Sequence, residues 1–280
     1  MTTNATPQTF LVAGATGSVG REVVRELLER GHTVRALTRN PSAAQFPPGV
    51  EVVGGDLADP GSLGPALDGV TGLHLITFTG GGYQPLETGP EIVALARKAG
   101  VRRLTVLNGG GPTPLEDAVR ESGLDWTVAM PVEFMANALG WADSIRTEAT
   151  VRAAFVDNVS AMVHEADIGA VIATALSEKG HAGQVYLVTG PQALTVREKV
   201  AALAAATGRE ISLVELSEAQ ALEKYLADGL DESTAAWMID VFKNTPPEGR
   251  TVIDTVQRVT GRPARPFSQW ATEHADAFRA

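Results

Sequence analysis

Short apolar runs alternate with amphipathic patterns through the first half of the chain. Apolar runs bounded by Gly, Pro or Asp are typical of buried strands, and apolar residues repeating at i, i+3 and i+4 indicate helices. The predicted strands are Thr9–Ala13, Thr33–Thr38, Glu51–Val53, Leu73–Phe78, Arg103–Leu107 and Trp126–Met130. The predicted helices cover residues 19–30, 60–67, 90–99 and 115–121. This alternation predicts an α/β fold with a doubly wound parallel sheet.

The second half of the chain has a less regular pattern. It predicts a helix through Leu176 that is capped by Asp167, a long helical stretch over Ser217–Phe242 and a last helix over Phe267–Phe278. Strands at Gln184–Val188 and Ile211–Glu215 flank a helix over Thr195–Ala206. We therefore expect a larger domain over 8–150, with sheet contributions from about 151–190, and a smaller α+β lobe over 191–280.

Three glycines with the spacing G-x-x-G-x-x-G follow the first predicted strand and open the first predicted helix. Gly14 permits a tight turn, Gly17 lets the backbone approach a phosphate, and Gly20 lets the helix pack closely on the strand. The start of the helix adds free N–H groups and the positive end of its dipole. The motif predicts a dinucleotide site, with cofactor contacts from Gly14, Thr16, Gly17, Ser18, Val19 and Gly20.

The composition argues against several classes of partner and chemistry. The chain has 280 residues, 44% of them hydrophobic, and a net charge of −10, which argues against nucleic acid as a partner. It has no cysteine, so disulfides and thiolate chemistry are excluded, and no paired-histidine spacing suggests a metal. The polar first residues and the lack of a long apolar run predict a cytoplasmic protein without a membrane segment.

The residue after the second predicted strand selects between the two nicotinamide dinucleotides. NAD-specific proteins commonly carry Asp or Glu there to bind the ribose 2′-hydroxyl, whereas this chain has Arg39. A guanidinium suits a 2′-phosphate, so NADPH is favoured over NADH. Asp56 and Leu57 follow the third strand, where they could contact adenine or belong to an ordinary loop.

The other predicted strands end in further candidate cofactor residues, because ligands of such sheets bind beyond the carboxyl ends of the strands. The candidates are Thr77, Phe78, Thr79, Asn108, Gly109, Pro131, Val132 and Phe134.

Several motifs along the chain together match the pattern of one family. They are Gly14 to Gly20, Arg39, Gly55-Asp56-Leu57, Ala99 to Arg103, Ser122 to Thr127, Pro131 to Asn137, Asp167-Ile168-Gly169 and Leu187 to Pro191. With these motifs the chain resembles the NmrA-like, atypical branch of the short-chain dehydrogenase/reductase superfamily, over about residues 8–275. The resemblance implies an NAD(P)-binding Rossmann domain with a small substrate lobe, in a family of quinone, azo and carbonyl reductases and of redox-sensing regulators.

The chain departs from most short-chain dehydrogenases because it lacks their Tyr-x-x-x-Lys pair. The residues four places after Tyr83, Tyr186 and Tyr225 are Glu87, Gly190 and Gly229. The charge that develops on a carbonyl oxygen needs stabilisation. Asn108 could donate a hydrogen bond, His164 or Tyr83 could act as the acid, or the substrate itself could delocalise the charge. We favour the last, because it needs no missing residue.

Phe134, Met135 and Trp141 could form an apolar wall for a flat substrate, or they could be ordinary core residues. Tyr83 and His164 are further candidates for substrate contact, although Tyr83 could be an exposed loop residue and His164 a structural histidine. The sequence thus predicts an NADPH-dependent reductase of an aromatic ketone or a quinone, such as a polyketide of secondary metabolism. The alternative is a non-catalytic NADP-sensing regulator that binds a protein partner. A sugar-nucleotide epimerase ranks last, since it normally needs the absent Tyr/Lys pair.

Overall fold

The computed structural model describes residues 7–78, 85–108 and 111–279. Backbone contacts divide the chain into two compact units. Unit 1 comprises Met1–Pro131, Glu165–Val188 and Thr255–Arg262. Unit 2 comprises Val132–His164, Thr189–Asp254 and Pro263–Ala280. The sequence assigns cofactor binding to a domain over 8–150 and substrate binding to a lobe over 191–280. These assignments stay predictions.

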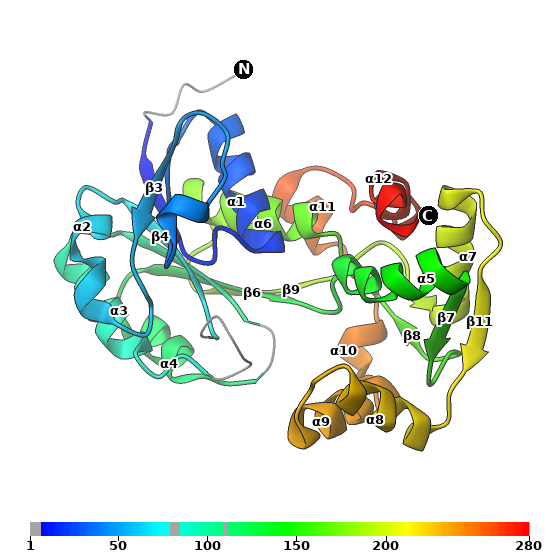
Figure 1. Ribbon diagram of the computed structural model, residues 1–280. Helices are drawn as coiled ribbons and strands as arrows, with labels where there is room; N and C mark the ends of the chain where they lie inside the picture. Colours follow the sequence, from blue (N-terminus) through cyan, green and yellow to red (C-terminus); the bar gives the residue numbers. More distant parts are fainter. Residues whose placement is uncertain (1–6, 79–84, 109–110, 280) are drawn as a thin grey trace. The chain divides into compact units, whose positions relative to one another are not determined.

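Unit 1 is built on a seven-stranded parallel sheet, which confirms the predicted fold class (Figure 1). Its strands are β1 (Thr9–Val12), β2 (Thr33–Thr38), β3 (Val50–Gly54), β4 (Gly72–Ile76), β5 (Arg103–Leu107), β6 (Asp125–Pro131) and β9 (Gln184–Val188). They lie in the order β3-β2-β1-β4-β5-β6-β9, and every neighbouring pair is parallel. The strand order reverses between β1 and β4, and open sheets bind ligands beside such a switch point.

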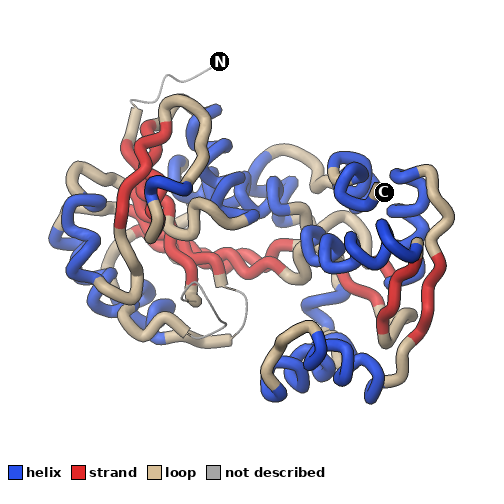
Figure 2. Tube along the Cα trace, viewed as in Figure 1, coloured by secondary structure: helices blue, strands red, loops and turns tan. Residues whose placement is uncertain are grey.

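Helices cover both faces of the sheet (Figure 2). One face carries α1 (Ser18–Glu29), α6 (Glu165–Ser177) and α11 (Thr255–Thr260). The other carries η2 (Pro60–Leu63), α2 (Gly64–Leu67), α3 (Gly89–Lys98) and α4 (Pro114–Glu121). A Cβ added at Gly169 of α6 would lie 2.5 Å from the Cβ of Glu22 on α1, so a glycine is needed for this close helix packing.

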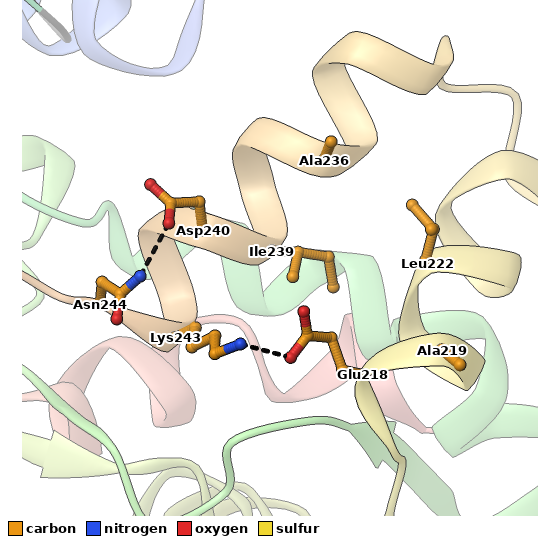
Figure 3. Close-up of a pocket in the computed structure, with 8 residues that line it drawn as sticks. All are labelled: Glu218, Ala219, Leu222, Ala236, Ile239, Asp240, Lys243 and Asn244. Atoms are coloured by element: carbon orange, nitrogen blue, oxygen red, sulfur yellow. Dashed lines mark hydrogen bonds and ion pairs between the residues drawn. The ribbon is translucent and has the colours of Figure 1, made fainter.

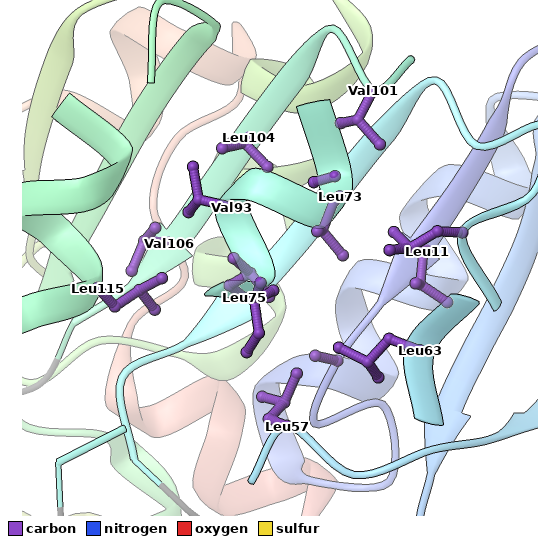
Figure 4. Packing of buried hydrophobic residues seen from close by; sticks show 14 of the residues in the cluster. Leu11, Leu57, Leu63, Leu73, Leu75, Val93, Val101, Leu104, Val106 and Leu115 are labelled. Atoms are coloured by element: carbon purple, nitrogen blue, oxygen red, sulfur yellow. The ribbon is translucent and has the colours of Figure 1, made fainter. Parts of the chain in front are cut away.

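The side chains of β4 alternate between the two faces of the sheet. Leu73 and Leu75 are buried in the apolar cluster beneath α3 and α4 (Figure 4). His74 lies between them and is fully buried, with Nδ1 2.9 Å from Thr105 Oγ1. Burial lowers the pKa of His74 to about 4, so this imidazole is neutral at neutral pH and forms part of the core.

Unit 2 combines helices with two small sheets. β7 (Thr150–Ala153) pairs with β11 (Ser212–Glu215), and β8 (Val159–Ser160) pairs with β10 (Leu194–Thr195). Its helices are η3 (Met135–Trp141), α5 (Ala142–Glu148), α7 (Val196–Thr207), α8 (Glu218–Ala227), α9 (Glu232–Lys243), α10 (Pro247–Arg250), α12 (Phe267–Glu273) and η4 (Ala275–Phe278). The fully buried Trp270 anchors its core and stacks on Phe267 with ring centroids 5.5 Å apart.

The single helical stretch predicted for residues 217–242 is wrong, because the chain forms two helices there, α8 and α9. Gly229 adopts a φ of +93°, a left-handed conformation that ends α8. Asp231 then caps α9 by accepting a hydrogen bond from the Thr234 N–H at 2.9 Å. These two local signals interrupt an otherwise continuous apolar repeat.

The predicted cap at Asp167 is also wrong, because α6 begins two residues earlier, at Glu165, and places both carboxylates in its first turn. That position suits them, since the positive end of the helix dipole lies there. Asp59 precedes η2 as predicted but makes no side-chain capping hydrogen bond. The predicted last helix is broken at His274 into α12 and η4.

Among the described residues, no helix is long and apolar enough to cross a bilayer.

Candidate functional site

The glycine turn between β1 and α1 has the shape that the sequence predicts. Gly14 adopts a φ of +62°, and its carbonyl oxygen accepts a hydrogen bond from the Gly17 N–H at 2.9 Å. Gly17 is the N-cap residue of α1 and offers no side chain to cap the helix. The first turn of α1 therefore presents its N–H groups and its positive dipole end, as a phosphate site requires.

Gly20 is the position where the turn tolerates a side chain least. A Cβ added there would lie 2.1 Å from the Gly14 carbonyl oxygen and 2.9 Å from the Ala15 Cα, both backbone atoms that cannot swing away. Thr16, Gly17 and Ser18 are exposed at the turn, whereas the Val19 side chain is buried. These residues fit the pyrophosphate of a dinucleotide, with exposed backbone at the turn and tight packing behind it.

Arg39 directly follows β2 and is exposed, at the carboxyl edge of the sheet and one strand from the glycine turn. At the end of the next strand, Asp56 Oδ1 accepts the Ala58 N–H at 2.9 Å, which is a turn within its own loop. Leu57 is buried in the apolar cluster beneath α2 and α3. The local bonds of Asp56 support the loop interpretation that the sequence had left open.

Arg21 is a residue that the sequence reasoning missed. Its Nε donates to the Thr16 carbonyl at 3.0 Å and its Nη1 donates to the Gln45 carbonyl at 3.0 Å. The guanidinium also lies 5.5 Å from the ring centre of Phe46. Arg21 thus joins the glycine turn to the segment that follows Arg39. Its place directly after the third glycine is the only sequence signal for it.

The carboxyl ends of β4 and β5 lie side by side, on the side of β1 that is opposite to β2 and Arg39. Thr77 is buried at the end of β4, and its Oγ1 donates to the Leu107 carbonyl at 3.4 Å. Phe78 is half-buried and forms an isolated bridge with Pro85. The candidates Thr79, Tyr83 and Gly109 lie outside the described residues.

Asn108 directly follows β5 and is 2% exposed. Its Nδ2 donates to Glu116 Oε2 at 2.6 Å and to the Gly111 carbonyl at 2.9 Å. Both amide hydrogens therefore have acceptors within the protein. This arrangement does not support Asn108 as the donor to a substrate oxygen.

Glu116 is a second residue that the sequence reasoning missed. It is 5% exposed in the first turn of α4, which Thr113 caps. Burial raises the pKa of its carboxyl, although Arg120 lies 3.8 Å away and opposes the effect. The Thr-x-x-Glu spacing is a capping-box signal that could have indicated this carboxylate. Nothing in the spacing indicates its bond to Asn108.

The candidates that follow β6 divide between the two units. Pro131 ends β6 in unit 1, whereas Val132, Phe134 and Met135 belong to unit 2. Phe134 is half-buried and forms a bridge with Val163. Met135 is 1% exposed within the core of unit 2, so it is a packing residue.

His164 is buried in unit 2, and its Nε2 lies 3.0 Å from Glu273 Oε2 on α12. Burial raises the pKa of Glu273, but hydrogen bonds from Gln269 and His164 outweigh it and leave this pKa lowered. A histidine bonded to a carboxylate in this way is held in one orientation. Trp141 is half-buried and packs against the core of unit 2.

A buried polar cluster, also missed from the sequence, lies in unit 2. The ammonium of Lys199 on α7 donates to Glu133 Oε2 and to Ser160 Oγ, each at 2.8 Å. The Ser160 hydroxyl also donates to Glu133. Lys199 is only 3% exposed, so its charge depends on this carboxylate. In the sequence, the only indication of this cluster is that Lys199 lies four residues before Leu203, on the apolar face of the same predicted helix.

A cavity of about 510 Å³ lies between α8 and α9 and contains none of the predicted site residues (Figure 3). Its polar side chains are paired, Lys243 with Glu218 at 2.7 Å and Asn244 with Asp240 at 2.7 Å. Within the described part of the chain, no group of three or more His, Asp or Glu side chains could hold a metal ion.

Comparisons with known proteins indicate NAD(P)H binding. A family model described as NAD(P)H-binding matches residues 14–114. The chain is 38% identical to the (4-alkanoyl-5-oxo-2,5-dihydrofuran-3-yl)methyl phosphate reductase of Streptomyces griseus, over 96% of this chain and 99% of that protein. It is 36% identical to the NAD(P)H azoreductase of Xenophilus azovorans, over 97% of this chain and 99% of that protein.

A solved structure is similar over most of the chain. It is the NADPH-dependent quinone oxidoreductase QOR2 of Escherichia coli in complex with NADPH, with a TM-score of 0.77 and 26% identity, covering 94% of this chain and 99% of that one. Fold, glycine turn and similarity together define the class as NAD(P)H-dependent oxidoreductases. Within that class, the chain belongs to the NmrA-like family of atypical short-chain dehydrogenases/reductases, as its motifs predict.

Proposed function

We propose that this protein is an NADPH-dependent reductase of a conjugated carbonyl compound, a quinone or an unsaturated ketone. The observation that carries the proposal is the glycine turn, with its uncapped helix start and a Gly20 that cannot be replaced without displacing backbone. Bound NADPH supplies the hydride. The protein binds and orients the cofactor through the turn and the neighbouring strand ends.

The substrate class is argued from the missing Tyr-x-x-x-Lys pair and from Asn108. Asn108 uses both amide hydrogens within the protein. A substrate that delocalises the charge left by hydride addition needs no strong side-chain acid. A quinone meets this condition, and so does a carbonyl compound whose ring or double bond is conjugated with the carbonyl.

The relatives' names agree with this class. They specify an azo compound, a quinone and an unsaturated lactone ring with an alkanoyl group, all of them conjugated acceptors. The predicted polycyclic aromatic ketones of secondary metabolism belong to the same class. Phe134 and Trp141, both half-buried in unit 2, are the aromatic side chains that we propose contact such a substrate.

Turnover on a panel of acceptors tests the function. We expect NADPH oxidation with naphthoquinones and enones, with one hydroquinone or saturated ketone formed per NADPH, and much slower reaction with isolated aliphatic ketones. Absorbance at 340 nm and product chromatography measure both. Tight NADPH binding without turnover on any acceptor would instead favour the redox-sensing regulator, which the missing Tyr/Lys pair also suits.

Replacing Arg39 by alanine tests the preference for NADPH. Removing the guanidinium that we propose pairs with the 2′-phosphate should raise the KM for NADPH by about tenfold to hundredfold. The KM for NADH should change by less than about threefold, since NADH has no 2′-phosphate. Initial-rate kinetics with both cofactors measure this difference.

Arg102→Ala is the matched control, because Arg102 is exposed and precedes β5, at the amino-terminal edge of the same sheet. It removes the same charge and should leave both KM values unchanged. An equal loss for NADPH and NADH in Arg39→Ala would remove the argument for 2′-phosphate recognition.

A further inference from the structure

Two strand ends lie on the side of the glycine turn opposite to Arg39. Arg39 follows β2, on one side of β1, whereas β4 and β5 lie on the other side. A dinucleotide whose pyrophosphate sits at the turn extends both ways along this edge. With the adenosine half beside Arg39, as the proposed function requires, the nicotinamide half lies over the ends of β4 and β5.

Asn108 directly follows β5 on this side, and every hydrogen bond described for it is made to the protein's own backbone or side chains. Its backbone N–H donates to the Ala129 carbonyl at 2.9 Å and so extends the pairing of β5 with β6. Its side chain reaches Gly111 at 2.9 Å and Glu116 at 2.6 Å. Asn108 thus joins the end of β5 to the start of α4.

The acceptor of the Asn108 side-chain amide is a buried carboxyl group, that of Glu116. A neutral glutamine could accept the same hydrogen bond, whereas a carboxylate that is 5% exposed carries a desolvation cost. Asn108 Nδ2 and Glu116 Oε2 nevertheless lie 2.6 Å apart, in a close hydrogen bond between two buried side chains. The pair is therefore built for a rigid geometry.

We propose that Glu116 is a positioning residue for the cofactor, which acts through Asn108 to fix the β5 end against which the nicotinamide half of NADPH binds. Glu116 does not touch the cofactor in this role. Removing the Glu116 carboxyl takes away one acceptor of the buried Asn108 side-chain amide and loosens the link between the end of β5 and α4.

Binding of two ligands to four proteins tests the proposal. The ligands are NADPH and 2′-phospho-ADP-ribose, a fragment that lacks nicotinamide, and calorimetry measures both without any substrate. We expect Glu116→Ala to weaken NADPH by about tenfold or more and the fragment by less than about twofold. Glu116→Gln keeps an acceptor and should retain NADPH affinity within about threefold.

Asp117→Asn is the matched control, because Asp117 is exposed in the same first turn of α4. It removes the same helix-end charge without a bond to Asn108 and should bind both ligands like the unmodified protein. Equal weakening of NADPH and of the fragment in Glu116→Ala, or unchanged NADPH affinity, would overturn the proposal.

If Glu116→Ala does not fold, exchanging the amide of Asn108 with the carboxyl of Glu116 tests the same proposal. Asn108→Asp should weaken NADPH, because two carboxylates then face each other, and the double variant Asn108→Asp/Glu116→Gln should recover at least half of the loss in binding free energy. Failure to recover would overturn the proposal. If the unmodified protein binds no NADPH, the proposed function fails, whereas a lack of quinone turnover with these binding results leaves the inference intact.

Discussion

Gly20→Ala is expected to abolish tight NADPH binding. The added Cβ would lie 2.1 Å from the Gly14 carbonyl oxygen and 2.7 Å from the Gly14 carbonyl carbon. Either the glycine turn or the start of α1 must move, and both form the proposed pyrophosphate site. Losing two charge-assisted hydrogen bonds to phosphate weakens affinity by about 3 kcal/mol, or roughly a hundredfold. Calorimetric titration with NADPH measures the loss.

Gly64→Ala is the matched control for this substitution. Gly64 lies in α2 with a helical φ of −50°, and a Cβ added there would meet no atom within 4 Å. It should bind NADPH like the unmodified protein and unfold at a similar temperature. If Gly20→Ala kept its affinity within about threefold, the glycine turn would not be the pyrophosphate site and the proposed function would lose its basis.

Lys199→Met is expected to destabilise unit 2 more than any surface substitution. Lys199 and Glu133 form an ion pair at 2.8 Å with side chains 4% and 17% exposed. Methionine fills a similar volume but leaves the Glu133 carboxylate without its cation in a largely buried site. Breaking such a pair costs about 3–5 kcal/mol of unfolding free energy. Urea unfolding followed by tryptophan fluorescence measures it, since three of the four tryptophans, Trp141, Trp237 and Trp270, belong to unit 2.

Lys243→Met provides the comparison for this effect. Lys243 pairs with Glu218 at 2.7 Å in the same unit, but both side chains are about half exposed, at 48% and 51%. Exposed pairs contribute only about 0–1 kcal/mol, so this variant should be nearly neutral. A Lys199→Met protein that lost less than about 1 kcal/mol would show that water reaches Glu133 and that the cluster is not a buried ion pair.

The strands and the glycine turn were predictable because their signals are local. β2, β5 and β9 have the bounds that the sequence predicts. The turn follows from glycine chemistry within seven consecutive residues, Gly14 to Gly20. The helical region of 217–242 was misread because two capping signals, Gly229 and Asp231, lie within an apolar repeat that continues past them.

The partners of the buried polar side chains were not predictable from the sequence. Glu133 and Lys199 are 66 positions apart, and His164 and Glu273 are 109 positions apart. The position of Asn108 after a strand made it a candidate donor to the substrate. The structure shows that its side-chain amide donates to Glu116, a partner that the sequence does not indicate. Side-chain partners of this kind depend on how helices and strands pack, which no local spacing encodes.

The sequence by itself determined the class of fold and the place of the cofactor turn, because strand burial and glycine conformations depend on residues that are close together in the chain. Only the tertiary structure decided which polar groups are already engaged, and so which of them remain for chemistry. Burial makes this difference: a charged or amide group removed from water must find a partner, and that partner can come from any point in the chain.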